Sequence, residues 1–195
     1  TSEWAHDPIL GMVLHQTVCL RQLAGGDHSG EIRFGRFLGN DAVTVERIIE
    51  GWSDQTRLAV EGRHVLALQD TSEIRFPTTE DNRRDLGKIK KGTCWGMLLH
   101  PLLGIDAESG ACLGLLGGRV WRRGDEELSP HAKRPLSEKE SRRWVETAEA
   151  AKPTLARAGM VTFIADRESD VYAMWARVPE AGFHVLSRVM HDRAL

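Results

Sequence analysis

Hydrophobic and polar residues follow two different patterns along this 195-residue chain. Up to about residue 60, apolar residues recur at three- and four-residue intervals, which is typical of amphipathic helices. From residue 64 onward, short apolar runs end abruptly at polar or acidic residues, which indicates buried strands. The pattern therefore predicts a small helical unit over residues 1–60, followed by an α/β unit over residues 61–195.

Three helices are expected in the first region. The first starts at Asp7-Pro8, since aspartate caps helices and proline suits the first helical position, and Gly25-Gly26 ends it. Ser29 is expected to cap the second helix and Thr44 the third. The third helix is expected to bury Val45, Ile48, Ile49 and Trp52. The region has five arginines, no lysine and eight acidic residues, so a DNA-binding role and a plain packing role both stay open.

Five strands are expected in the second region: His64–Gln69, Trp95–Leu103, Ala111–Trp121, Val161–Ala165 and one that begins at Phe183. Asp106–Gly110 reads as a hairpin turn between the second and third. A capping box at Ser137–Glu140 opens a helix that Pro153 kinks or ends. A short helix separates the last two strands. This order matches, by analogy, the ribonuclease H-like arrangement, in which the first and fourth strands are parallel neighbours.

Composition indicates an ordinary globular protein. The formal net charge is −2, hydrophobic residues make up 41% and charged residues 28%. No apolar run approaches the ~20 residues that span a bilayer, and no signal-peptide pattern opens the chain. Three widely separated cysteines, Cys19, Cys94 and Cys112, favour a reduced cytoplasmic setting without a disulfide framework. Because no methionine opens the chain, a processed product or a fragment is expected.

Two aspartates carry the candidate chemistry. Asp70 ends the first predicted strand and Asp166 ends the fourth. If these strands are parallel neighbours, the two carboxylates converge at one edge of the sheet and repel each other. A divalent cation relieves this repulsion, and paired hard cations suit phosphoryl transfer.

Several motifs occur in the order in which a known family has them. They are Arg33–Asn40, Leu66–Glu73, Leu86–Lys88 before Gly92 and His100, the strand end at Trp121, Glu138–Trp144 and Ala165–Tyr172. Together they resemble bacterial insertion-sequence transposases of the DDE class, in the cut-and-paste branch of the insertion-sequence-four type. The resemblance covers nearly the whole chain and implies a ribonuclease H-like mixed sheet, incomplete at its C-terminus, behind a small all-α domain.

The resemblance implies roles for particular residues. Asp70 and Asp166 would be catalytic ligands of Mg²⁺, with Mn²⁺ as a substitute and two ions in a complete site. Arg167 and Glu168 would support the site or contact DNA. The basic residues that would bind DNA are Arg83, Arg84, Lys88, Lys90, Lys91, Arg119, Arg122 and Arg123. The implied partners are double-stranded transposon-end and target DNA and a second copy of the chain, in the nucleoid of the bacterial cytoplasm.

The family's third ligand is a glutamate in a late helix that follows an inserted β-rich segment, and this chain ends before either. We therefore expect the 195-residue chain to lack cleavage activity by itself. A non-catalytic DNA-binding or inhibitory form, a remnant without a present role, and an α/β domain whose aspartates only cap turns are the alternatives. For the basic segment Arg83–Lys91, expected to be a mobile loop, the plain interpretation is a solvated surface.

Overall fold

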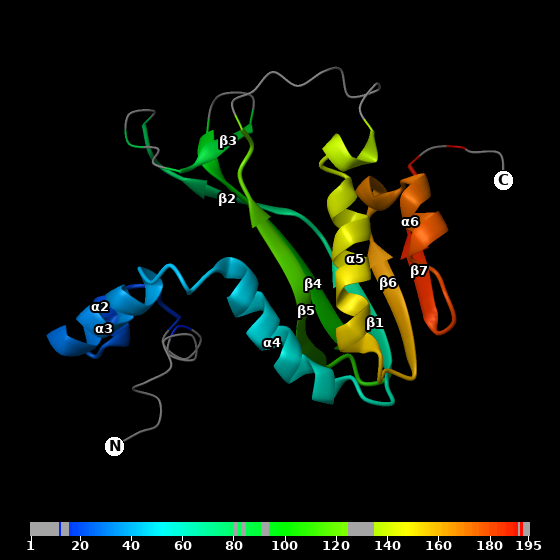
Figure 1. The fold of residues 1–195 in the computed structure, drawn as a ribbon, viewed down its shortest axis with the longest axis horizontal. Helices are drawn as coiled ribbons and strands as arrows, with labels where there is room; N and C mark the ends of the chain where they lie inside the picture. The colour runs from blue at the N-terminus through cyan, green and yellow to red at the C-terminus, as the bar shows by residue number, and fades with distance from the viewer. Residues whose placement is uncertain are drawn as a thin grey trace. The chain divides into compact units, whose positions relative to one another are not determined.

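The computed structural model describes residues 12, 16–79, 82, 85–90, 94–124, 135–190 and 192 (Figure 1). The chain divides into two compact units, Thr1–Arg47 and Ile48–Leu195. The predicted start of the first helix at Asp7 lies outside the described residues. The functional boundary expected near residue 60 stays a prediction, because compactness assigns no role to either unit.

The described part of the first unit contains α2 (Leu20–Leu23) and α3 (His28–Leu38). Asp27, and not Ser29 as predicted, caps α3: its carboxylate accepts hydrogen bonds from the backbone N–H groups of Ser29 at 3.1 Å and Gly30 at 2.8 Å. An ionised carboxylate is the better acceptor at the positive end of a helix. Phe34 is the buried apolar residue of α3.

Helix α4 (Val45–Ala59) starts where the sequence predicted, since the Thr44 hydroxyl accepts from the Arg47 N–H at 3.3 Å. Its buried side differs from the prediction. Ser53 and Thr56 are buried, whereas Trp52 is 38% exposed. A Cβ atom on Gly114 would lie 2.5 Å from the Thr56 hydroxyl. Only a glycine at position 114 therefore permits this close approach of α4 to the sheet. The buried side of α4 consequently carries the small residues Ser53 and Thr56 in place of the predicted Trp52.

A mixed sheet of seven strands forms the second unit, and the chain is thus of the α/β class. The strands are β1 (His64–Gln69), β2 (Ser72–Phe76), β3 (Gly87–Lys90), β4 (Cys94–Asp106), β5 (Cys112–Trp121), β6 (Met160–Ala165) and β7 (Phe183–Ser187). The order is β2-β4-β1-β6-β7, with β3 and β5 also paired with β4. β1, β4 and β5 form the expected antiparallel meander. β6 is parallel to both β1 and β7.

Two of these strands, β2 and β3, were not predicted. β3 replaces part of the expected mobile loop, because Ile89 is buried and a Cβ atom at Gly87 would lie 2.4 Å from the Arg123 carbonyl oxygen. Such close backbone contact holds the segment against the sheet. Arg83, Arg84 and Lys91 lie outside the described residues, as does the side chain of Lys90.

Helix α5 (Arg142–Leu155) also differs from the prediction. Ser137 lies in the short 3₁₀ helix η4 (Leu136–Glu138) and does not cap α5. Glu140 is not part of a capping box, because its carboxylate binds Arg123 at 2.7 and 3.0 Å. Pro153 lies inside α5, which continues to Leu155.

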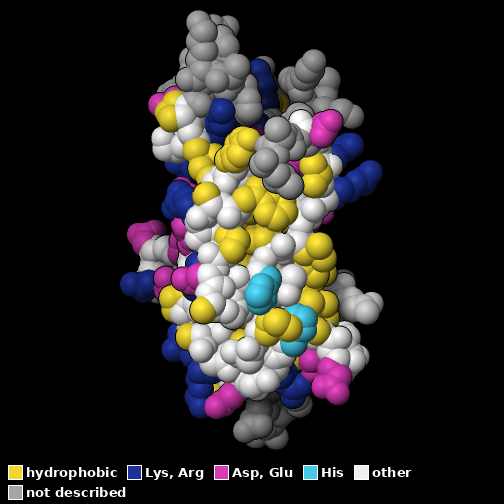
Figure 2. All heavy atoms as spheres, turned by 90° about the vertical axis from the view of Figure 1, so that its right-hand side faces the viewer, with side chains coloured by type: hydrophobic (Ala, Val, Ile, Leu, Met, Phe, Trp, Pro, Cys, Tyr) yellow, Lys and Arg dark blue, Asp and Glu magenta, His cyan; other side chains and the backbone are white. Residues whose placement is uncertain are grey.

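The core lies between one face of the sheet and α5. Helix α6 (Tyr172–Arg177) adds Met174 to this core. Its sheet residues include Val65, Ala67, Leu102, Leu116 and Phe163, and its helix residues include Trp144, Val145, Ala148, Ala151, Leu155 and Met174. Exposed apolar side chains gather elsewhere: Figure 2 shows them on the side of the molecule that carries β7, where Leu186 is 59% exposed. Every helix in the described part of the chain falls short of the length and apolar character needed to cross a membrane.

Candidate functional site

The two predicted strand-end aspartates lie at the same edge of the sheet. β1 and β6 are parallel neighbours in a register that runs from His64 beside Met160 to Leu68 beside Ile164. The same register continued by two positions sets Asp70 beside Asp166. Neighbouring strands are about 4.8 Å apart, so the two aspartates lie at adjacent strand ends, and both are exposed.

The chain leaves the strand at Asp70 for a reason that the sequence contains. β1 and β2 pair with β4 in one continuous antiparallel register, interrupted at Asp70 and Thr71. That register places Pro101 of β4 opposite Asp70. Proline has no N–H group, so the ladder lacks a donor at this point and the carbonyl opposite it is freed. The interruption between β1 and β2 therefore falls at the aspartate.

Each aspartate keeps one carboxylate oxygen available. The Thr71 N–H donates to Asp70 Oδ1 at 2.7 Å, and the Glu168 N–H donates to Asp166 Oδ1 at 2.8 Å. No hydrogen bond among the described residues reaches the Oδ2 atom of either. Two neighbouring, ionisable carboxylates with available oxygens form a donor set that fits Mg²⁺ or Mn²⁺, with water completing the coordination.

Hydrogen bonds from the next strand hold the backbone at Asp166. This residue caps the 3₁₀ helix η5 (Arg167–Ser169). Its carbonyl oxygen accepts from the Ser169 hydroxyl at 2.8 Å and from the Ser187 hydroxyl at 3.1 Å. Because Ser187 ends β7, the ends of β6 and β7 are joined directly behind the aspartate.

Asp170, the last acidic residue of the Asp166–Asp170 motif, serves a different purpose. It is buried, accepting from the Trp175 indole at 3.3 Å and from the Met190 N–H at 2.8 Å. Its carboxylate therefore anchors α6 and the segment after β7. The structure brings Asp70 and Asp166 together without Asp170.

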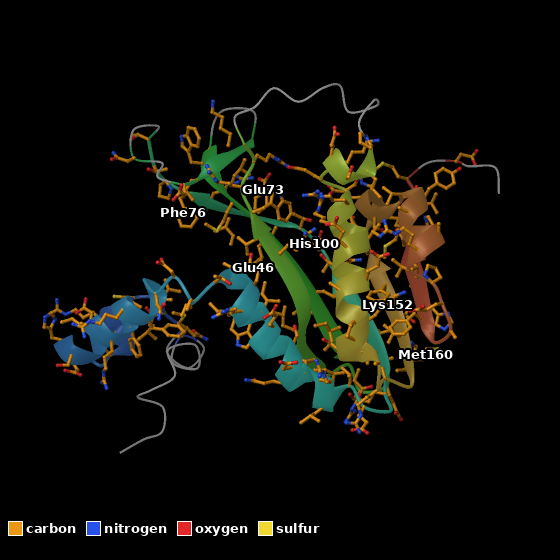
Figure 3. The ribbon with its side chains drawn as sticks, in the orientation of Figure 1. Glu46, Glu73, Phe76, His100, Lys152 and Met160 are labelled. Atoms are coloured by element: carbon orange, nitrogen blue, oxygen red, sulfur yellow. The ribbon has the colours of Figure 1, made fainter. Side chains whose placement is uncertain are left out.

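A chain of polar groups, buried at Gln69, His100 and Arg143, runs from Gln69 to the exposed Glu168. His100 of β4, seen facing α5 in Figure 3, pairs through Nε2 with Gln69 Oε1 at 3.2 Å and through Nδ1 with the Thr71 hydroxyl at 2.9 Å. Arg143 of α5 donates through Nε to the same Thr71 hydroxyl at 2.8 Å and through Nη2 to Glu168 Oε2 at 2.7 Å. The chain thus connects the residues that follow both aspartates.

Burial fixes the charge states along this chain. Desolvation, reinforced by the positive charge of Arg143, lowers the pKa of His100 from 6.5 to about 3. The imidazole is therefore neutral, so one of its ring nitrogens donates and the other accepts. Burial lowers the pKa of Arg143. The negative charges of Glu168 and Glu140 raise this pKa and so offset part of the effect of burial. A guanidinium nevertheless keeps its charge in proteins.

The predicted basic residues fall into two groups. Arg119 pairs with Glu146, and Arg123 pairs with Glu140 and donates to the Ile89 carbonyl at 2.6 Å. The side chains of these two arginines are therefore engaged in contacts within the chain. In contrast, the exposed residues Lys88, Arg122 and Arg167 take part in no ion pair among the described residues, although the Lys88 ammonium lies 5.5 Å from the centroid of the Trp95 ring.

Sequence reasoning missed Arg143, Thr71 and the role of His100. Arg143 directly precedes Trp144 and Val145 on the buried side of α5, and its side chain is only 10% exposed. An arginine within a helix's apolar stripe is the signal that could have revealed it, since a buried charge requires a partner. Glu168, predicted as a supporting residue, supplies that partner.

No group of three or more potential metal-binding side chains occurs among the described residues, so two carboxylates make up the donor set seen here. No family model matches the chain.

Proposed function

We propose that this chain is part of a DDE-class DNA transposase: a helical amino-terminal unit with the metal-binding part of a ribonuclease H-like catalytic core. One observation carries the proposal, namely the placement of Asp70 and Asp166 at the adjacent ends of two parallel strands. An antiparallel meander of β5, β4 and β1, continued by parallel β6 and β7, is the strand arrangement such a core requires. The sequence motifs at both aspartates support the same assignment.

Asp70 and Asp166 would hold Mg²⁺ or Mn²⁺ through their available Oδ2 atoms. A bound divalent cation supplies Lewis-acid stabilisation to the oxygens of a phosphodiester and lowers the pKa of an attacking hydroxyl. The chain's own contribution is to keep two like charges next to each other in a fixed orientation. The backbone N–H groups of Thr71 and Glu168 each hold one oxygen of a carboxylate and leave the other available.

Exposed cations suit a DNA backbone as partner. Arg167 directly follows Asp166, and Arg122 and Lys88 lie on strands or strand ends that flank β4. Phosphate contacts of this kind are strongest at low salt, because they release condensed counterions. The net charge of −2 is no obstacle, since such contacts depend on local charge.

Metal binding tests the proposal more directly than cleavage, because the described residues provide two carboxylates. Titration of the 195-residue chain with Mn²⁺, followed by electron paramagnetic resonance, is expected to reveal binding that weakens by about tenfold or more in Asp70→Asn and in Asp166→Asn. Asp54→Asn, at an exposed aspartate of α4, is the matched control and should bind like the wild type. Binding that ignores both Asp70 and Asp166, or no binding, would contradict the proposal.

An electrophoretic shift with double-stranded DNA at low salt tests the partner. A shift that weakens in Lys88→Ala, Arg122→Ala and Arg167→Ala is expected, with the ion-paired Arg119→Ala changing less. DNA binding without Mn²⁺ binding at Asp70 and Asp166 would instead favour the non-catalytic DNA-binding form.

A further inference from the structure

Arg143 is the residue that touches both strand ends of the candidate site. Its Nε atom donates to the hydroxyl of Thr71, which follows Asp70, and its Nη2 atom donates to Glu168, two residues after Asp166. These bonds of 2.8 and 2.7 Å leave from two nitrogen atoms of one planar, rigid group. The guanidinium therefore fixes the distance and the angle between the segment after Asp70 and the segment after Asp166.

The guanidinium itself is held in place. Its carbon atom lies 5.7 Å from the ring centroid of Trp121 and 5.3 Å from that of Trp144, within range of cation–π attraction. His100 fixes Thr71 from the other side and packs edge-on against Trp144, with ring centroids 4.6 Å apart. The half-buried Trp121 ring and the buried Trp144 ring thus support the donor, and Trp144 also supports His100, which bonds to one of its acceptors.

The two acceptors of Arg143 hold the aspartates through their backbones. The Thr71 N–H binds Asp70 Oδ1, and the Glu168 N–H binds Asp166 Oδ1. Each strand end thus repeats one arrangement, in which a side chain accepts from Arg143 and the same residue's amide orients a carboxylate. A shift of Arg143 is transmitted to both carboxylates.

We propose that Arg143 is a positioning residue that sets the separation and orientation of Asp70 and Asp166 before a metal binds. This inference rests on the proposed function, in which a divalent cation is what the two carboxylates hold. Two neighbouring carboxylates repel each other without a cation. The cationic clamp opposes their separation and presents a preformed site.

Amide hydrogen exchange, followed by NMR on the metal-free 195-residue chain, tests the clamp without metal or DNA. Lysine cannot donate in two fixed directions from one planar group. Arg143→Lys should therefore speed exchange about tenfold at both the Thr71 and Glu168 amides, as expected for loss of a charge-assisted hydrogen bond. The Ala67 and Phe163 amides, inside β1 and β6, should exchange as in the wild type, which excludes general unfolding.

Two further variants complete the exchange test. Arg142→Lys changes the exposed neighbour on the same helix and is expected to alter neither amide. Glu168→Gln, at a carboxylate whose side chain is 57% exposed, weakens one arm with little risk to folding, because the remaining acceptor carries no charge. It should speed exchange at residue 168 and leave residue 71 protected. Wild-type protection of both amides in Arg143→Lys and in Glu168→Gln would overturn the clamp.

Mn²⁺ titration separates the clamp from the proposed function. Arg143→Lys should weaken Mn²⁺ binding by about tenfold, as outer partners of metal ligands do, while Arg142→Lys leaves it unchanged. Binding that depends on Asp70 and Asp166 but not on Arg143 would overturn the clamp and leave the proposed function standing. Binding that ignores the aspartates would overturn the proposed function, whatever the amides show.

Discussion

The two faces of the central sheet use similar residues in different ways. On the face toward α5, Val65, Ala67 and Gln69 of β1 are buried. On the opposite face, Leu66 is half-buried and Leu68 is 38% exposed, and Leu103 of β4 is 39% exposed. Parallel strands are commonly buried on both sides. Here, one face carries both the apolar core and the polar chain beneath the candidate site, and the other is partly exposed at Leu68 and Leu103.

The polar network of Gln69, His100 and Arg143 lies on the buried face of the sheet. His100 bonds to Gln69 and Thr71, and Arg143 bonds to Thr71, inside a core that shields these hydrogen bonds from water. The same groups on the opposite face would bond to solvent and fix nothing. Burial therefore makes these hydrogen bonds specific, and its cost is met by the apolar packing of the same face.

The largest expected difference between the faces comes from truncating their apolar side chains. Trp144 is fully buried, so Trp144→Ala should lower the free energy of unfolding by about 3–5 kcal/mol. Leu103→Ala, on the opposite face, should cost about 1 kcal/mol, because part of the side chain already contacts water. Urea unfolding measures both. Equal losses would show that the two faces are packed alike.

Acid should weaken the α5 face through His100. Its pKa is about 3 in the folded chain against 6.5 for an unperturbed imidazole, so the unfolded state takes up the proton first. The stabilisation is complete above about pH 6.5 and is lost as the pH falls toward 3, by an amount on the order of 5 kcal/mol.

Urea unfolding between pH 7 and 4 measures this dependence. Because carboxylates also titrate there, the informative quantity is the difference in slope between the wild type and His100→Gln. The exposed His184→Gln serves as the control and should keep the wild-type slope. Identical slopes in all three proteins would contradict a neutral, buried His100.

The smallest effects are expected on the face away from α5. Leu68→Thr should change the free energy of unfolding by no more than about 0.5 kcal/mol, as is usual for exposed positions. The preceding residue, Ala67, is fully buried, and Ala67→Leu should cost about 1–3 kcal/mol by overpacking. Chemical denaturation of these two variants compares adjacent residues on opposite faces of one strand. A larger loss in Leu68→Thr would reverse the assignment of the faces.

The sequence predicted the framework of the sheet well. The β1, β4, β5, β6 and β7 strands appear near their predicted positions, because short apolar runs bounded by polar residues depend mainly on local chemistry. β2 escaped prediction because it is short: the alternation of Ile74 and Phe76 with Glu73 and Arg75 extends over only four residues, and all five residues of the strand are exposed. The α5 start was misplaced because Glu140 found a better partner, Arg123, 17 positions away in sequence.

Resemblance indicated the two aspartates, and the fold brings their strands together. The apolar runs alone indicated that Asp70 and Asp166 each end a strand. Tertiary structure alone decided that Pro101 faces Asp70 and that Arg143 meets Thr71, 72 positions away, and Glu168, 25 positions away. A local pattern specifies which residues end a strand, whereas contacts between distant segments depend on strand register and helix packing, which only the folded chain fixes.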